Sequence, residues 1–195
     1  MIKKTIIFFI FFLFSSISYS DENNDLIEKF LTKFKSINNI EFNFIQTSTD
    51  MVEKGKCFLS YPKKLICRYE GDEGKEIIVK NDALVIVKRK FQRVYYYRVA
   101  NSPYASILDK NKITLQTKNI KNITTDNNVL IVDFNNDIEN SKFQLFIDKS
   151  NFNITGWKII GYDNQIINFK VFNSKINVKN NEKFEIPEDS YGNRN

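Results

Sequence analysis

Alternating apolar and polar residues run through most of this chain, and this pattern constrains its fold more than any other feature. Three stretches carry it most clearly, residues 130–134, 143–147 and 167–171, each with an apolar side chain at every second position. A period of two predicts strands with one apolar and one polar face. Because the gaps between such stretches are too short for repeated crossover helices, we expect a single antiparallel, meandering sheet.

Turn residues divide the pattern into short strand segments. Pro62 stands second in a turn at 61–64, and two glycines frame another turn at 71–74. The predicted strands are 41–46, 55–60, 65–70, 75–80, 84–87, 94–99, 113–117, 129–134, 143–148, 155–160, 166–172 and 184–186.

Two segments are typical of helices. In residues 23–37, apolar side chains recur three and four positions apart, which predicts one long amphipathic helix. A short helix is expected at 101–108, with Ser102 as its cap and Pro103 at its first position. A sheet of this size tends to curl, and two helices are too little to cover its apolar side. Periodicity leaves two alternatives: a curved sheet with an incompletely covered apolar trough, or a closed barrel filled by its own aromatic side chains.

The N-terminus predicts export. Lys3 and Lys4 precede an apolar run at 6–14, and Ser18-x-Ser20 resembles a cleavage site. As a helix the run spans roughly 14 Å, too short for a bilayer core of about 30 Å. We therefore expect a signal peptide at 1–20 and a single exported domain at 21–195. Without Lys3 and Lys4, the 29 basic residues become 27 against 23 acidic ones, a mature net charge of +4.

Composition argues against most enzyme classes. The chain has no histidine, which excludes Ser-His-Asp triads and histidine metal sites, and its two cysteines cannot close a four-ligand zinc site alone. It contains no nucleophile elbow, P-loop or dinucleotide fingerprint. Most of its acidic residues fall in predicted turns, where solvation explains them. We expect no catalytic site, no metal, no cofactor and no nucleic-acid partner.

Cys57 and Cys67 lie symmetrically about Pro62, so a tight hairpin would place them opposite each other on one face. In an oxidising compartment this arrangement predicts a disulfide. The alternative is a pair of buried thiols that pack as small apolar side chains.

A basic cluster, Lys88, Arg89 and Lys90 with Arg93, is expected at a hairpin tip. Such tips protect sheet edges and keep proteins soluble. The functional alternative is docking on an acidic partner or an anionic membrane.

Weak motifs follow one another along the mature chain in a specific order. They are the helix 26–37, Phe44-x-Gln46, Gly55 opening a strand that ends in Tyr61-Pro62, Tyr69, a hairpin at 81–84, Gln92, Ser102-Pro103 through Leu108, Trp157, Asp163, Asn180 and Phe184-x-Ile186-Pro187. In this order and spacing the chain resembles the periplasmic outer-membrane lipoprotein carriers, the LolA family.

The resemblance implies a mainly β fold with α-helices: an unclosed, strongly curved antiparallel β-barrel covered by lid helices, with an apolar cavity for acyl chains. It implies a monomeric periplasmic carrier whose cargo is acylated lipoproteins. An inner-membrane ATP-driven transporter would load it, and an outer-membrane lipoprotein receptor would unload it. A sensory module on the same half-barrel and an enzyme acting on lipids or glycans are the competing functions.

One position departs from the family pattern. Family members commonly have an arginine before the proline that matches Pro62, and it helps to hold the lid shut; this chain has Tyr61 there. The latch candidates are Tyr61, by a hydrogen bond, and Lys63 or Lys64, by substitution; without such a latch the lid would open more easily. The residues predicted to form the cavity or lid are Phe30, Phe34, Phe44, Leu59, Leu65, Leu84, Ile86, Ile107, Phe143 and Leu145.

Overall fold

A computed structural model describes residues 19–101, 105, 107–111, 113, 120–136, 141–161 and 165–187. These residues form helix α1 (Tyr19–Ser36), two 3-10 turns, η1 (Arg89–Phe91) and η2 (Val99–Asn101), and one antiparallel sheet. The strands are β1 (Asn39–Thr47), β2 (Val52–Ser60), β3 (Lys64–Tyr69), β4 (Lys75–Lys80), β5 (Ala83–Lys88), β6 (Arg93–Arg98), β7 (Ile120–Asp126), β8 (Val129–Asn136), β9 (Ser141–Asp148), β10 (Ile154–Ile160) and β11 (Ile166–Ile176).

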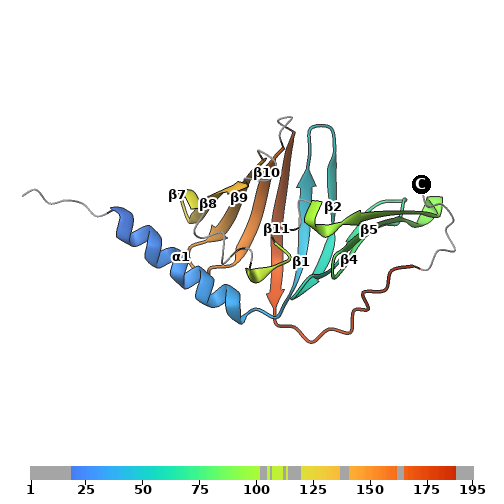
Figure 1. Ribbon diagram of the computed structural model, residues 1–195, viewed down its shortest axis with the longest axis horizontal. Helices are drawn as coiled ribbons and strands as arrows, with labels where there is room; N and C mark the ends of the chain where they lie inside the picture. Colours follow the sequence, from blue (N-terminus) through green and yellow to red (C-terminus); the bar gives the residue numbers. More distant parts are fainter. Residues whose placement is uncertain are drawn as a thin grey trace, which may run out of the picture.

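The sheet consists of two meanders joined in the middle. Its 11 strands follow the order β6-β5-β4-β3-β2-β1-β11-β10-β9-β8-β7, so the first and last strands in sequence pair with each other. Strands β6 and β7 are its two edges and do not pair, which leaves the sheet open and curved (Figure 1). The predicted unclosed, curved half-barrel is confirmed, and the alternative of a closed barrel is wrong.

The predicted elements agree with the structure over most of the chain. The long helix begins at Tyr19 rather than at residue 23, and no helix in the described part of the chain is long and apolar enough to cross a bilayer. Strand β7 was not predicted, and the strand expected at 113–117 is wrong at Ile113, which is helical. The segment 184–186 is extended but not a strand. The predicted signal peptide up to residue 18, residues 102–104 and 106 of the short helix, and residues 114–117 lie outside the described residues. In the rest of the short helix expected at 101–108, Asn101 ends η2, and Ala105, Ile107 and Leu108 lie in turns or bends, so the helix prediction is wrong there.

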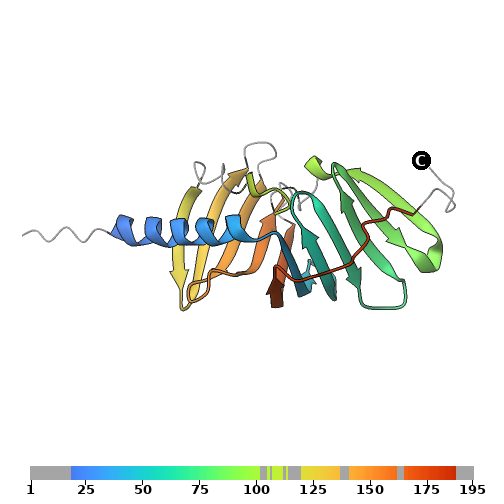
Figure 2. The ribbon, with the colours of Figure 1, turned by 90° about the horizontal axis from the view of Figure 1, so that it is seen from below.

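The inner, concave face of the sheet carries the main core. Alternate residues of both meanders point to this face, and side chains from α1 such as Phe30 and Phe34 pack into the same cluster. Gly55 lets the first meander pack tightly, because a Cβ there would lie 2.2 Å from the Arg68 carbonyl oxygen and 2.8 Å from the Phe44 ring. Helix α1 crosses the β7–β10 half of the sheet (Figure 2).

The outer face of the first meander has a smaller apolar cluster of its own. Phe58, Ile66, Ile78, Val85 and Val87 are buried there. The C-terminal segment, residues 178–187, crosses β2–β5 (Figure 2) and packs side chains including Phe184 against this cluster. Arg68 donates two hydrogen bonds of 2.8 Å to the Glu182 carboxylate, which fixes the segment to β3.

Candidate functional site

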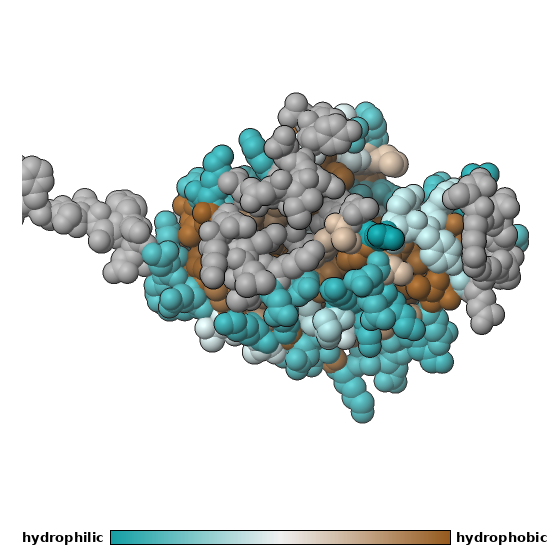
Figure 3. Space-filling model, in the orientation of Figure 1, coloured by the Kyte–Doolittle hydropathy of each residue, from teal (hydrophilic) through white to brown (hydrophobic). Residues whose placement is uncertain are grey.

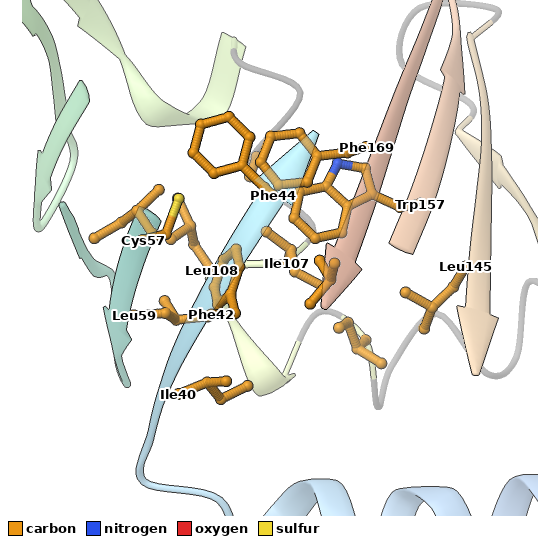
Figure 4. Packing of buried hydrophobic residues seen from close by; sticks show 14 of the residues in the cluster. Ile40, Phe42, Phe44, Cys57, Leu59, Ile107, Leu108, Leu145, Trp157 and Phe169 are labelled. Carbon is orange, nitrogen blue, oxygen red and sulfur yellow. The ribbon is translucent and has the colours of Figure 1, made fainter. Parts of the chain in front are cut away.

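An apolar pocket lies where the two meanders meet, between the inner face of the sheet, the end of α1 and the turn after β9. Side chains from β1, β2, β3, β10 and β11 form its walls (Figure 4). Its lining residues are Phe34, Ile37, Ile40, Phe42, Cys57, Leu59, Tyr61, Leu65, Cys67, Ile107, Phe152, Asn153, Ile154, Trp157, Phe169, Val171, Ser174 and Ile176.

The pocket is nearly filled in this structure. Its lining encloses about 620 Å³ when the open solvent at its mouth is counted, but the cavity itself measures about 30 Å³. A cavity of that size holds only about two or three water molecules. The protein's own side chains therefore fill most of the expected trough, and a hydrocarbon chain would fit only after some of them move.

Stacked aromatic rings lie at the junction of the meanders, and two of them, Trp157 and Phe169, form part of the pocket wall. The rings of Trp157 and Phe169 stack at 4.2 Å with an interplanar angle of 10°, and Phe169 stacks on Phe44 at 4.7 Å. Figure 4 shows these three rings side by side above Phe42. Such rings supply a large apolar area with few rotatable bonds. This wall is built from sheet strands, so it is the fixed part of the site.

Loops and α1 complete the lining around the sheet: Phe34 and Ile37 at the end of the helix, Tyr61 after β2, Phe152 and Asn153 after β9, and Ile107. We call residues 107–111 the lid segment. Ile107 and Leu108 are buried in the trough between the two meanders (Figure 4). The Lys63 backbone N–H donates to the Leu108 carbonyl at 3.2 Å, and the Tyr61 hydroxyl donates to the Ile107 carbonyl at 3.2 Å. The turn between β2 and β3 thus holds the lid segment by hydrogen bonds to two of the segment's backbone carbonyls.

Tyr61 also contacts α1. Its ring meets the Phe34 ring edge-on at 5.6 Å, and burial raises the pKa of its hydroxyl, so this group stays protonated and can donate. Tyr61 therefore joins the helix and the lid segment at one point. It stands directly before Pro62 and was one of the three predicted latch residues.

Lys110 forms a second contact between the lid segment and α1. Its ammonium donates to the Lys35 carbonyl in the last turn of the helix at 3.0 Å and lies 4.8 Å from the centre of the Tyr61 ring. A cation is favoured at a helix C-terminus and over an aromatic face. Burial lowers the pKa of Lys110. We call Tyr61 and Lys110, with the carbonyls that they contact, the clasp.

Seven of the ten predicted cavity or lid residues lie on the inner face of the sheet, and the other three, Phe30, Phe34 and Ile107, pack against it from α1 and the lid segment. Nine are buried in the main cluster, and Ile86 is partly buried against it. Four of the ten line the pocket: Phe34, Leu59, Leu65 and Ile107. The other six pack elsewhere in the cluster: Phe30, Phe44, Leu84, Ile86, Phe143 and Leu145. A role in binding cargo stays a prediction for all ten.

The three latch candidates lie in different surroundings. Tyr61 is in the clasp, whereas the Lys63 ammonium pairs with Asp82 at 3.1 Å, so its side chain points away from α1. Lys64 is exposed at the start of β3. Cys57 and Cys67 are joined by a disulfide that forms part of the pocket wall.

Sequence reasoning missed several residues of the site. Phe42 and Phe169 were recognisable from strand alternation, but Lys110 has no local signature. Asn153 was also missed; its side-chain oxygen Oδ1 is buried in the pocket wall, and no described residue donates to it. A buried carbonyl oxygen without a donor carries a desolvation cost of about 1–3 kcal/mol.

Comparisons with known proteins match this chain to one family. The family described as outer membrane lipoprotein carrier protein LolA matches residues 35–187. The outer-membrane lipoprotein carrier protein of Francisella tularensis subsp. novicida (strain U112) is 30% identical over 149 residues, which cover 69% of this chain and 68% of that protein.

Solved structures show only distant likeness. A LolA superfamily protein from Nitrosomonas europaea has a TM-score of 0.43 at 10% identity and covers 88% of this chain and 97% of its own. A chain of the MucA/MucB complex of Pseudomonas aeruginosa has a TM-score of 0.49 at 8% identity, covering 89% of this chain and 61% of its own. Likeness at this level supports no statement about function.

Proposed function

Because the chain belongs to the outer membrane lipoprotein carrier family, LolA, we propose that it carries acylated lipoproteins and shields their acyl chains in the apolar pocket. The observation that carries the proposal is the pocket itself: fixed aromatic sheet walls covered by α1 and the lid segment. In this proposal the protein works in the periplasm after removal of residues 1–20. An inner-membrane ATP-driven transporter loads it, and an outer-membrane lipoprotein receptor unloads it.

The cost of exposing acyl chains explains why a carrier is needed. Each methylene costs about 0.8 kcal/mol in water, so a chain of 16 carbons costs on the order of 12 kcal/mol. Free diffusion of a lipoprotein through an aqueous compartment is therefore extremely slow. A protein that replaces this water contact with apolar side chains removes the barrier.

The small cavity volume requires the lid to move during loading. In the structure, Phe34, Ile107 and Leu108 occupy the space over the pocket walls. We propose that α1 and the lid segment swing away together when cargo enters, because Lys110 ties them to each other, and that the contacts of Tyr61 to both then break. The disulfide-bonded hairpin β2–β3 and the stacked rings stay in place as the walls. Two arrangements with similar free energies allow loading and release without a nucleotide.

The test uses the mature chain and a dipalmitoylated lipopeptide, with the same peptide lacking its acyl chains as a control. Native mass spectrometry should show a one-to-one complex with the lipopeptide and none with the control peptide. The protein purified from its native compartment should also carry endogenous lipoprotein. If neither complex is found, the proposed function is wrong.

A further inference from the structure

Two rows of side chains lead from the pocket to the free edge of the sheet at β6. One row consists of directly paired residues: Phe42, Cys57, Cys67, Ile77, Ile86 and Tyr95. The second row runs beside it from Ile40 to Tyr97. Paired side chains on one face lie about 4.5–5.5 Å apart at their Cβ atoms, so each row is a continuous apolar path.

Exposure rises along these rows. Cys67 is 1% exposed and Ile77 4%, Ile86 is partly buried, and the final residues Tyr95 and Tyr97 are 37% and 51% exposed. Within the described chain β6 pairs only with β5, so nothing in the sheet lies beyond these tyrosines. The surface on the side of the molecule where β5 and β6 lie exposes weakly polar and apolar residues (Figure 3).

Charged side chains flank this path on one side, and loops flank it on the other. On one side, Lys75, Lys88 and Arg93 stand in register across β4, β5 and β6, and the first two are paired with Glu53 and Glu73. On the other side, the Leu108 carbonyl accepts a hydrogen bond from the turn after β2, and Val99 N–H donates to the Asp82 carbonyl in the turn after β4. A hydrocarbon chain that follows the apolar surface is thus directed along the rows.

The opposite edge of the sheet does not offer such a path. On β7, Ile120 and Ile123 are packed against the main cluster, and the strand's other residues are polar. On the neighbouring strands, Leu130, Leu145 and Ile147 are completely buried in the cluster that α1 joins. The aromatic, accessible end of the inner face is therefore at β6.

We propose that the inner face of β6 is the portal through which an acyl chain of the cargo enters and leaves the pocket, with Tyr95 and Tyr97 as its threshold. This inference rests on the proposed carrier function and adds the route. A tyrosine has an apolar ring and a polar tip, which suits a position between water and hydrocarbon. In the portal, the chain contacts the two rings first and moves along the rows into the pocket once the lid segment has opened.

The strand supplies its own control. Tyr96 is 51% exposed, as is Tyr97, but it lies on the outer face because neighbouring strand residues alternate. Loading of a dipalmitoylated lipopeptide with a fluorophore acceptor on one acyl chain is followed by stopped flow. The donor is Trp157, which lines the pocket and is the single tryptophan of the chain. The variants are Tyr95→Ser with Tyr97→Ser, the same pair changed to Phe, and Tyr96→Ser.

A portal stabilises the transition state for entry and exit of the acyl chain and leaves the free energy of the bound state unchanged. The double serine variant should therefore lose about tenfold in both the association and the release rate, the effect of roughly 50 Å² of lost apolar contact, with Kd nearly unchanged. The phenylalanine pair and Tyr96→Ser should keep wild-type rates. Unchanged rates in the double serine variant, or a raised Kd with an unchanged association rate, overturns the portal while the carrier function stands. Failure of the wild-type protein to bind the lipopeptide overturns both.

Discussion

The clasp makes a quantitative prediction about the lid. Tyr61→Phe removes one hydroxyl and leaves the ring between Phe34 and Lys110 in place. The lost bond to the Ile107 carbonyl is 3.2 Å long, at the weak end for a neutral hydrogen bond, so we assign it about 1 kcal/mol. If this contact exists only in the closed lid, the open arrangement becomes about fivefold more populated. Lipopeptide loading should accelerate by the same factor, because the lid opens before the chain enters.

The matched control is Tyr69→Phe. Tyr69 is also buried on the inner face, and its hydroxyl donates to Gln46 Oε1 at 2.9 Å, but both residues belong to sheet strands. This variant should lower the free energy of unfolding as Tyr61→Phe does, without changing the loading rate. Stopped-flow loading monitored at Trp157 and hydrogen exchange of the lid segment measure the two effects. Equal loading rates for Tyr61→Phe and wild type would show that Tyr61 does not latch the lid.

Three further predictions concern the helix, the pocket wall and the C-terminal segment. Phe34→Glu places a carboxylate in the lid and should abolish lipopeptide loading, whereas Thr32→Glu on the exposed side of α1 should not. Circular dichroism verifies that the sheet of each variant remains folded. Normal loading by Phe34→Glu would refute the lid role of this residue. Asn153→Leu removes the buried oxygen that lacks a donor and should raise the free energy of unfolding by about 1 kcal/mol in urea titrations; a loss of stability would mean that Oδ1 has a partner. The hydrogen bond to Arg68 lowers the pKa of Glu182 in the folded protein. The stabilising effect of this pair is therefore complete above the pKa that Glu182 has in the unfolded chain, and it is lost as pH falls through the lower pKa of the folded protein. Limited proteolysis should therefore cut the segment 178–187 faster in acid in the wild type, while Glu182→Gln, cut faster than wild type at neutral pH, should show no such acid step.

Strand alternation predicted the fold well because local pattern and tertiary burial agree on the inner face. Strand β7 escaped prediction because its two isoleucines, Ile120 and Ile123, are three positions apart, across a register shift between Ile120 and Asn122. The opposite error occurred at 184–186, where Phe184 and Ile186 alternate like strand residues. They pack on the outer cluster through side chains alone, so the apolar period is present without a ladder of hydrogen bonds.

The candidate site was predictable only in part. Alternation placed seven of the ten predicted residues on the inner face, and the other three pack against it from α1 and the lid segment. Which of them line the pocket depends on where α1 and the lid segment rest, and this is set by contacts between residues far apart in sequence. The bond between Lys110 and the Lys35 carbonyl joins positions 75 residues apart, and no local pattern marks either end.

The nearly filled pocket fits a carrier better than a permanently open trough would. An empty apolar hole of 150 Å³, enough for a benzene molecule, costs about 3.6 kcal/mol at roughly 24 cal/mol per Å³. A hole large enough for a whole acyl chain would cost more, and it would leave a large apolar surface open to aggregation. In the proposed carrier, Ile107, Leu108 and Phe34 rest in the trough in place of cargo and avoid this cost. Loading then exchanges one set of apolar contacts for another, so its free energy is small compared with that of either set alone. The clasp sets the remaining difference, and because it consists of single weak contacts, a change of about 1 kcal/mol there shifts the balance between loading and release.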